Sequence, residues 1–351
     1  MKHLASCWAG LLLCAAAPLA LAANTWTVTS TGSGGACTAG STTDANCTLD
    51  VAISDATDGD TILFAASVQG QVISGNFLFA KGLTIDGGAR GVILDGGGAG
   101  TVVDIEGGAV VLKNLTVQNG MGNNSGGGIL GRGTSLTIDS CTIAHNTASG
   151  FGAGIDTGSG TTTTIINSTI ADNTVTNLAA GGGIYGLGDL VIANSTITGN
   201  AASGVSPYGY GGGILATGGL TLLSSIVAGN SATAGAPDIN NNGSTSTLGY
   251  NIVGNLGAYS GLGAPATGDQ FNVDPLFATS GPANNGGATP TVALQSLSPA
   301  RSGGNCAGNA TNPVIPAVTL DQTGQTRASS GAIGCTVGAF DMTSIFHNGF
   351  E

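Results

Sequence analysis

Residues 126–149 read GGGILGRGTSLTIDSCTIAHNTAS, and the same pattern returns three more times in the chain. The later copies are GAGIDTGSGTTTTIINSTIADNTVT (152–176), GGGIYGLGDLVIANSTITGNAAS (181–203) and GGGILATGGLTLLSSIVAGNSAT (211–233). The asparagines at 146, 173 and 200 are 27 residues apart, and the next follows 30 residues later, at 230. A repeat this short cannot bury its own apolar side, so the copies must stack on one another as a solenoid.

Apolar and polar positions alternate within each copy, which is the periodicity of a strand. The strands are rich in Ile, Val and Thr, and no stretch between them is long enough for a crossover helix. We therefore predict an all-β fold, a right-handed parallel β-helix with about one coil per repeat and rungs about 4.8 Å apart.

The repeat also predicts which residues stack in columns. Two inward ladders are expected, Ile129, Ile155, Ile184 and Ile214 in one and Ile143, Ile170, Ile197 and Val227 in the other. A third column, at a turn, contains Asn146, Asn173, Asn200 and Asn230. Stacked amides can bond to one another and to the turn backbone, so we interpret the asparagine column as structural.

Residues 1–22 have the pattern of a secretory signal, with Lys2 and His3 before an apolar run and an A-x-A site ending at Ala22. The rest of the chain is expected to be soluble or attached to a surface, because no later stretch is as long as a membrane span. Charged residues make up only 7% of the chain and the net charge is −12. This balance excludes nucleic acid and anionic membranes as expected partners, and we expect a monomer.

Five cysteines follow the predicted signal. Cys37 and Cys47 flank a short loop and Cys306 and Cys335 a longer one, so we predict these two disulfides for an exported protein. Cys141 remains, at a core position that serines occupy in later repeats, and is expected to be a buried free thiol. No cysteine spacing fits a zinc site, and we expect no cofactor.

Before the repeats, residues 47–56 change to helical spacing, with apolar Leu49, Ala52 and Ile53 and Thr48 as the N-cap. A short capping helix is expected there over the first coil. The run CTLDVAI (47–53) followed by GDTILF (59–64) resembles the CSLREA-type domain that opens bacterial surface β-helix proteins, although Asp50 and Val51 stand where that family has Arg and Glu.

Two further resemblances cover the rest of the chain. The repeats, with GGI at 127–129 and IAHN at 143–146, resemble those of the chlamydial polymorphic outer-membrane proteins, which are adhesins. DPLF (274–277), NGGATPT (285–291), LSPA (297–300), DQTG (321–324) and CTVGAFD (335–341) resemble the choice-of-anchor Q domain of secreted proteins. We predict a signal (1–22), an N-terminal cap (23–60), the β-helix (61–255), an irregular C-terminal cap (256–341) and a tail (342–351).

Catalytic candidates are few. A uronide lyase needs a basic residue, and Arg132 is the only one in the four repeats. A glycosidase needs two facing carboxylates, and Asp139, Asp156, Asp172 and Asp189 fall at four different repeat positions. His145 and Asp172 should be neighbours on adjacent rungs, but a His beside an Asp on a solvated turn is usually a weak surface pair.

Aromatic residues suggest binding instead. The residue after each inward isoleucine should point outward, and this position is Tyr185 in the third repeat. Just before the repeats, the loops carry Phe151, Tyr208 and Tyr210, which could form a strip that stacks on sugar rings. The alternative is that these rings fold back as loop cover.

An outward column of Thr142, Thr169 and Thr196 is also expected, but only Thr196 and Thr198 have the doubled spacing that ice binding favours.

Taken together, these patterns predict a secreted or surface-displayed, calcium-independent and non-catalytic β-helix, adhesive or glycan-binding, whose partner is a polysaccharide or a cell surface. The alternative is a polysaccharide lyase or glycoside hydrolase of the pectin-lyase-like fold.

Overall fold

The computed structural model describes residues 23–177, 180–203, 210–258, 260–278, 281–301, 303–310, 315–327 and 335–341. The predicted signal (1–22), the predicted tail (342–351) and Tyr208 lie outside these residues.

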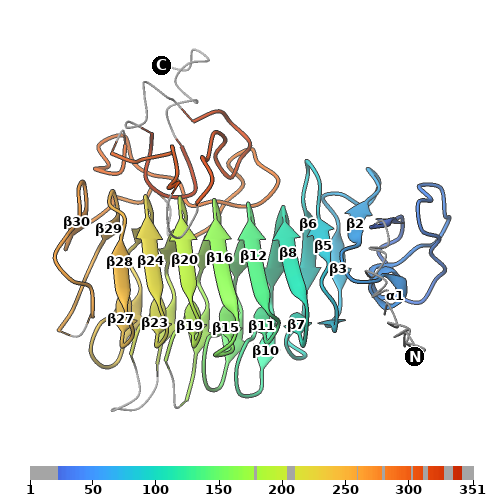
Figure 1. The fold of residues 1–351 in the computed structure, drawn as a ribbon, viewed down its shortest axis with the longest axis horizontal. Helices are drawn as coiled ribbons and strands as arrows, with labels where there is room; N and C mark the ends of the chain where they lie inside the picture. Colours follow the sequence, from blue (N-terminus) through green and yellow to red (C-terminus); the bar gives the residue numbers. More distant parts are fainter. Residues whose placement is uncertain are drawn as a thin grey trace, which may run out of the picture.

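The described chain winds into a parallel β-helix, as the repeats predicted (Figure 1). Strands from successive coils pair in parallel in three long sheets and one short one, and each repeat makes one coil. The three long sheets are named A, B and C, and the short one is named D. Each coil runs through sheets C, A and B in that order, and the central coils then add a short strand of sheet D.

Sheet A contains β1 (Thr25–Val28), β2 (Thr61–Phe64), β5 (Thr84–Asp86), β8 (Ala109–Lys113), β12 (Ser135–Asp139), β16 (Thr162–Ile166), β20 (Leu190–Ala193), β24 (Leu220–Leu223) and β28 (Thr245–Thr247). Sheet B contains β3 (Val72–Ser74), β6 (Val92–Asp95), β9 (Leu115–Gln118), β13 (Thr142–Ala144), β17 (Thr169–Ala171), β21 (Thr196–Thr198), β25 (Ile226–Val227), β29 (Ile252–Val253) and β30 (Gln270–Phe271).

Sheet C contains β4 (Phe77–Phe79), β7 (Val103–Ile105), β11 (Ile129–Gly131), β15 (Ile155–Thr157), β19 (Ile184–Gly186), β23 (Ile214–Ala216) and β27 (Ile239–Asn241). Sheet D contains β10 (Met121–Gly122), β14 (Thr147–Ala148), β18 (Thr174–Val175), β22 (Ala201–Ala202) and β26 (Ser231–Ala232).

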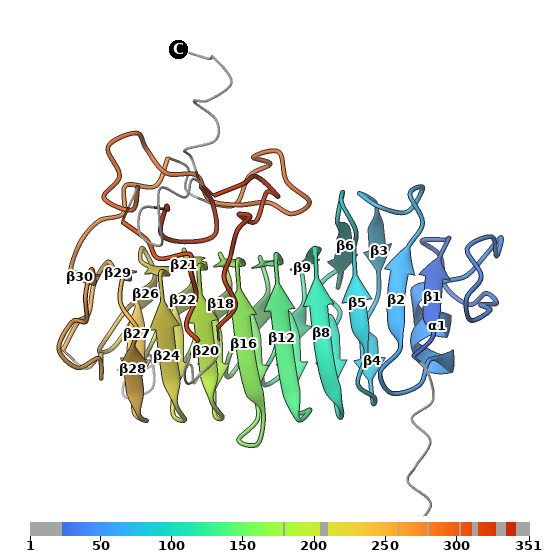
Figure 2. The same ribbon diagram turned by 45° about the horizontal axis from the view of Figure 1, so that its top comes forward.

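A helix, α1 (Leu49–Asp55), lies beside β1 at the N-terminal end of the coil (Figure 2). Its buried residues are Leu49, Ala52 and Ile53, which is the apolar face that the helical spacing predicted. Thr48 occupies the N-cap position in an extended conformation but makes no capping hydrogen bond with its side chain. Packing of the apolar face therefore holds this helix more than its cap does.

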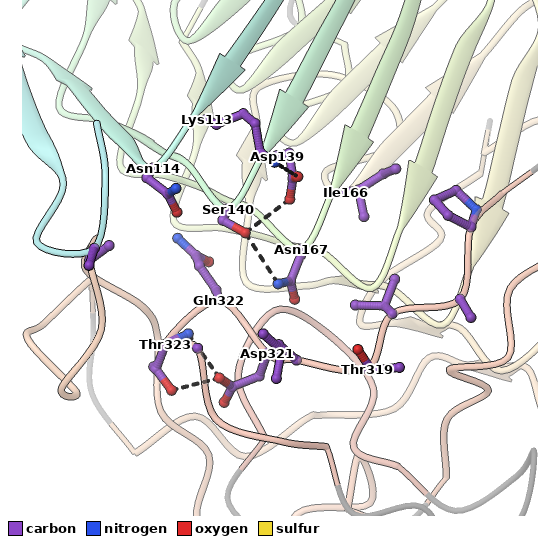
Figure 3. Close-up of a pocket in the computed structure, with 17 residues that line it drawn as sticks. Lys113, Asn114, Asp139, Ser140, Ile166, Asn167, Thr319, Asp321, Gln322 and Thr323 are labelled. Atoms are coloured by element: carbon purple, nitrogen blue, oxygen red, sulfur yellow. Dashed lines mark hydrogen bonds and ion pairs between the residues drawn. The ribbon is translucent and has the colours of Figure 1, made fainter. Parts of the chain in front are cut away.

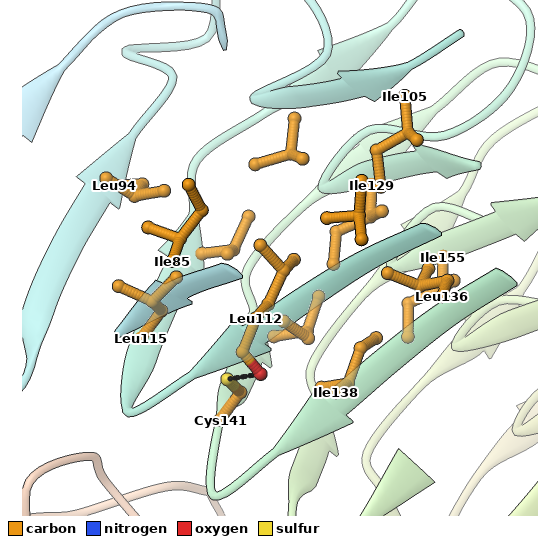
Figure 4. Packing of buried hydrophobic residues seen from close by; sticks show 14 of the residues in the cluster. Ile85, Leu94, Ile105, Leu112, Leu115, Ile129, Leu136, Ile138, Cys141 and Ile155 are labelled. Carbon is orange, nitrogen blue, oxygen red and sulfur yellow. Dashed lines mark hydrogen bonds between the residues drawn. The ribbon is translucent and has the colours of Figure 1, made fainter. Parts of the chain in front are cut away.

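Both predicted isoleucine ladders are confirmed by the strand register. Ile129 pairs with Ile155 in sheet C, Ile143 pairs with Ile170 in sheet B, and all four are fully buried. Figure 4 shows Ile129 and Ile155 in this core, together with inward residues of sheet A such as Leu112, Leu136 and Ile138. Burial in this apolar core raises the pKa of the Cys141 thiol to about 12, so the predicted free thiol is buried and un-ionised. The two predicted disulfides, Cys37–Cys47 and Cys306–Cys335, are present.

The asparagine column is a continuous hydrogen-bonded ladder. Asn146 donates both its backbone N–H and its Nδ2 to Asn173 Oδ1, each at 3.0 Å, and Asn173 bonds to Asn200 in the same way. Asn200 bonds to Asn230, and Asn230 donates to Asp238 Oδ1 at 2.8 Å. The ladder therefore runs through four coils and ends on a buried carboxylate.

The glycines of the Gly-Gly-Gly motif leave the space that the asparagine side chains of this ladder occupy. A Cβ on Gly183, the third glycine of its motif, would lie 2.6 Å from Gly213 O and 3.0 Å from the Asn200 side chain. The first glycine has a positive φ, as at Gly181 (67°), where a side chain would be strained. The repeat thus combines a left-handed turn with space for a buried amide.

The C-terminal region (residues 272–341) docks on the outer faces of sheets A and B (Figure 1). Leu294, Ala300 and Val337 pack on Ile226 and Ile252, which point outward from sheet B. A second contact places Ile315 against Leu223 and neighbouring residues of sheet A.

The predicted outward threonine column is present, but it is not exposed to solvent. Thr142, Thr169 and Thr196 do stack on the outside of sheet B, but each is at most 2% exposed. The C-terminal region covers them, because Gln322 bonds to Thr142 and Thr169, and Ala339 N donates to Thr196 Oγ1. These hydroxyls hold the C-terminal region on the coil and are not available to ice or another ligand.

Candidate ligand-binding face

The outer face of sheet C presents one column of side chains that point away from the core. The register of the seven strands aligns Leu78, Asp104, Leu130, Asp156, Tyr185, Leu215 and Asn240. The loop before each central strand bends back over this column, since a Cβ on Gly152 would lie 2.9 Å from the Cα of Asp156. As a result Asp156 and Leu215 are only 7% exposed, whereas Leu130 and Tyr185 remain half-buried.

Phe151 and Tyr185 are brought together on this face. Their ring centroids are 4.8 Å apart, and the ring planes are inclined by 25°. Phe151 and Tyr210 occupy equivalent loop positions, because both form parallel bridges with Ala180. The alternative that these rings fold back as loop cover therefore holds in part, because the Phe151 ring packs on the Tyr185 ring. Phe151, Tyr185 and Tyr210 all remain half-buried.

Charged groups lie on the same face, with Asp104 three strands and Asp156 one strand away from Tyr185. Arg132, the basic residue of the four repeats, forms an ion pair with Asp104 (3.8 Å between Nη2 and Oδ1). Burial raises the pKa of Asp156 to about 6, and the hydrogen bond from Ser125 and the charge of Arg132 offset this only in part. Burial also raises the pKa of Asp104, and burial together with Asp156 raises the pKa of Tyr185.

Two carboxylates do share a column on this face. Asp139, Asp156, Asp172 and Asp189 lie at different positions, as predicted, but Asp104 shares the column of Asp156, with Leu130 between them. Asp104 was missed because it precedes the four clear repeats. The Val-Asp-Ile of β7 pairs with Ile-Leu-Gly of β11, and aligning these two segments would have found it.

His145 and Asp172 lie on adjacent coils at one turn position, as predicted. Both have positive φ angles (57° and 55°), as do Gly199 and Gly229 in the next coils. Burial raises the pKa of Asp172, and His145 opposes this shift. Neither residue is in the two ion pairs found among the described residues, Lys113–Asp139 and Arg132–Asp104. A left-handed turn accounts for this column without a catalytic role.

We expect the protein to be most stable at an acidic pH of about 4. Asp156 and Asp238 both have pKa values of about 6, above the unfolded value, so their contribution is complete at low pH and is lost as the pH rises through 6. Asp60 acts in the opposite sense. Burial alone would raise its pKa, but hydrogen bonds from Thr57, Trp26 and Asn24 lower it to about 2, so its contribution is lost as the pH falls below about 4.

Thermal unfolding between pH 2 and pH 8 tests this expectation. Going from pH 7.5 to 5 should stabilise the chain by about 1 kcal/mol for each of the two raised carboxyls. The variant Asp156→Asn cannot titrate and should show about half of that change. A midpoint that rises steadily from pH 5 to 8 would contradict the assignment.

Within the described ranges, no group of three or more His, Cys, Asp or Glu side chains could hold a metal ion. No helix in that part of the chain is long and apolar enough to cross a bilayer.

Comparison with known proteins identifies a fold but no family. No protein-family model matches the chain, and none of the curated proteins matches it. The CSLREA-type, polymorphic-outer-membrane-protein and choice-of-anchor Q resemblances therefore stay predictions. A solved structure of pectate lyase Pel9A is similar, with a TM-score of 0.50 over 90% of this chain and 96% of that one, at 12% identity. At this identity the similarity shows the parallel β-helix fold alone.

Proposed function

We propose that this protein is an extracellular β-helix that binds a polysaccharide on the outer face of sheet C without cleaving it. The stacked Phe151–Tyr185 pair, half-buried on the same outer face as the Arg132–Asp104 ion pair, carries the proposal. Aromatic rings offer apolar surface to the C–H faces of sugars, and charged groups at their edge can bond to hydroxyls. The two disulfides support export to an oxidising compartment.

A second candidate function is glycoside hydrolysis on the same face. The observation that favours it is the pair of carboxylates, Asp104 and Asp156, two strands apart in one column. Two strand spacings are about 9.5 Å, which is at the upper limit for the carboxylates of inverting glycosidases. In that reaction Asp156, which keeps its proton near pH 6, would protonate the leaving oxygen.

Retention on a panel of immobilised neutral and acidic polysaccharides tests the binding proposal. Replacing both rings, Phe151→Ala with Tyr185→Ala, should weaken retention at least tenfold, since rigid aromatic side chains usually dominate such contacts. Leu297→Ala is the control, because Leu297 is apolar and 84% exposed but belongs to the C-terminal region. Retention that is unchanged in the double variant, with an unchanged circular dichroism spectrum, would contradict the proposal.

The same polysaccharides are then assayed for new reducing ends. We expect none. Release of reducing ends that Asp156→Asn abolishes would replace the binding proposal by the hydrolytic one.

A further inference from the structure

A groove of ≈ 660 Å³ lies between the coil and the C-terminal region, away from the residues of sheet C (Figure 3). One wall is formed where strands of sheet A end and turn toward sheet B, at Lys113, Asp139 and Ile166. The other wall is the segment 316–324. The volume is within the range of small-ligand sites, and clefts between two packed parts of a chain are common places for such sites.

Both walls are fixed by buried hydrogen bonds. Gln322, which is 2% exposed, donates to Cys141 O, and Thr289 Oγ1 donates to Ser140 O. Arg327 Nη2 donates to Asn167 Oδ1 at 2.8 Å, and so connects the C-terminal region to a residue of the groove. A groove with walls held in this way needs little reorganisation to accept a ligand.

The coil wall is polar and can be reached from solvent. Lys113 Nζ is 3.4 Å from Asp139 Oδ2, with side chains 38% and 32% exposed. Ser140 Oγ donates to Asp139 Oδ1 at 2.9 Å, and Asn167 Nδ2 is 3.4 Å from Ser140 Oγ. An exposed ion pair contributes little to stability, so a ligand can bond to both charges at small cost.

The facing wall has an apolar part beside the polar side chains of residues 321–323. Pro316, Ala317, Val318 and Leu320 contribute to it, and Leu320 is 48% exposed. No aromatic side chain lines the groove. The groove therefore combines one edge of alternating donors and acceptors with one aliphatic surface.

We propose that this groove is a second binding site, for a neutral pyranose ring at the end of a glycan or in a free disaccharide. Such a ring has hydroxyls at its edge, which can accept from Lys113 and donate to Asp139, and C–H faces that fit the aliphatic wall. An acidic sugar fits less well, because the wall carries a carboxylate beside its single lysine. This site is independent of the proposed outer-face site.

Calorimetric titration of the full chain with maltose, cellobiose and lactose, each to about 10 mM, tests the proposal. At least one should bind, and Lys113→Met and Asp139→Asn should each weaken it at least tenfold without changing the unfolding midpoint. Asp189→Asn is the matched control, an exposed coil carboxylate outside the groove. Glucuronic acid is the charged probe and should bind more weakly.

The proposal would be overturned if no neutral probe bound, if both groove variants bound as tightly as the unmodified chain, or if glucuronic acid bound more tightly than the neutral sugars. Tyr185→Ala separates the two sites. If it abolished disaccharide binding, the sugar would be on the outer face of sheet C and the groove site would be rejected. If polysaccharide retention fails but a disaccharide still binds at the groove, the outer-face proposal alone is rejected.

Discussion

Replacing Asn173 by alanine is expected to destabilise the coil by about 3 to 5 kcal/mol, because each buried polar group left without a partner costs about 1–3 kcal/mol. Asn173 Oδ1 accepts two bonds from Asn146, and its Nδ2 donates to Ile143 O and to Asn200 Oδ1, both at 2.9 Å. The alanine variant leaves the Asn146 donors and the Ile143 carbonyl buried without these partners. Thermal and denaturant unfolding measure the loss.

Asn242→Ala is the matched control, since Asn242 is exposed at the surface of a later coil. It should change stability by less than about 0.5 kcal/mol. If Asn173→Ala and Asn242→Ala unfolded at the same temperature, the ladder would not be the stabilising feature inferred here.

Replacing Arg327 by alanine should release the C-terminal region from the coil, at a cost of about 3 to 5 kcal/mol for breaking a buried charged network. Arg327 is 2% exposed and donates to Asn167 on the coil and to the carbonyls of Thr336 and Gly338. Burial lowers the pKa of Arg327 to about 10, and the nearby charges of Asp321 and Asp341 oppose this shift. Arg327 therefore stays charged at neutral pH.

Limited proteolysis distinguishes local release from global unfolding. In Arg327→Ala, cleavage should accelerate in residues 272–341 while the coil resists. Arg90→Ala, at an exposed arginine of an early coil, should leave the pattern unchanged. Equal protease resistance of the C-terminal region in Arg327→Ala and the unmodified chain would show that this arginine does not hold it.

Regular spacing explains why so much of the coil could be predicted. The 27-residue period determines which residues stack, so both isoleucine ladders, the asparagine column and the burial of Cys141 followed from sequence position. The two disulfides followed from loop lengths and an exported context.

Contacts between distant segments could not be predicted in this way. Thr142 has the outward register of an exposed strand residue, but Pro290 and Gln322, 148 and 180 positions later, dock on it and bury it. Asp104 lies in a coil whose sequence has drifted from the repeat, so its place beside Leu130 becomes visible only in the strand pairing. The groove lies between coil residues such as Lys113 and Asp139 and the distant segment 316–324, and no sequence pattern marks it.

The asparagine ladder has a direction. Along the ladder, each side-chain oxygen accepts from the coil before it and each Nδ2 donates to a side-chain oxygen of the coil after it, so the side-chain dipoles align along the axis, and the donor end meets the Asp238 carboxylate. Each coil therefore presents the same acceptor on one side and the same donor on the other. A duplicated 27-residue unit could join the stack at any internal position, so such a protein can lengthen by gene duplication while its two ends remain non-interchangeable.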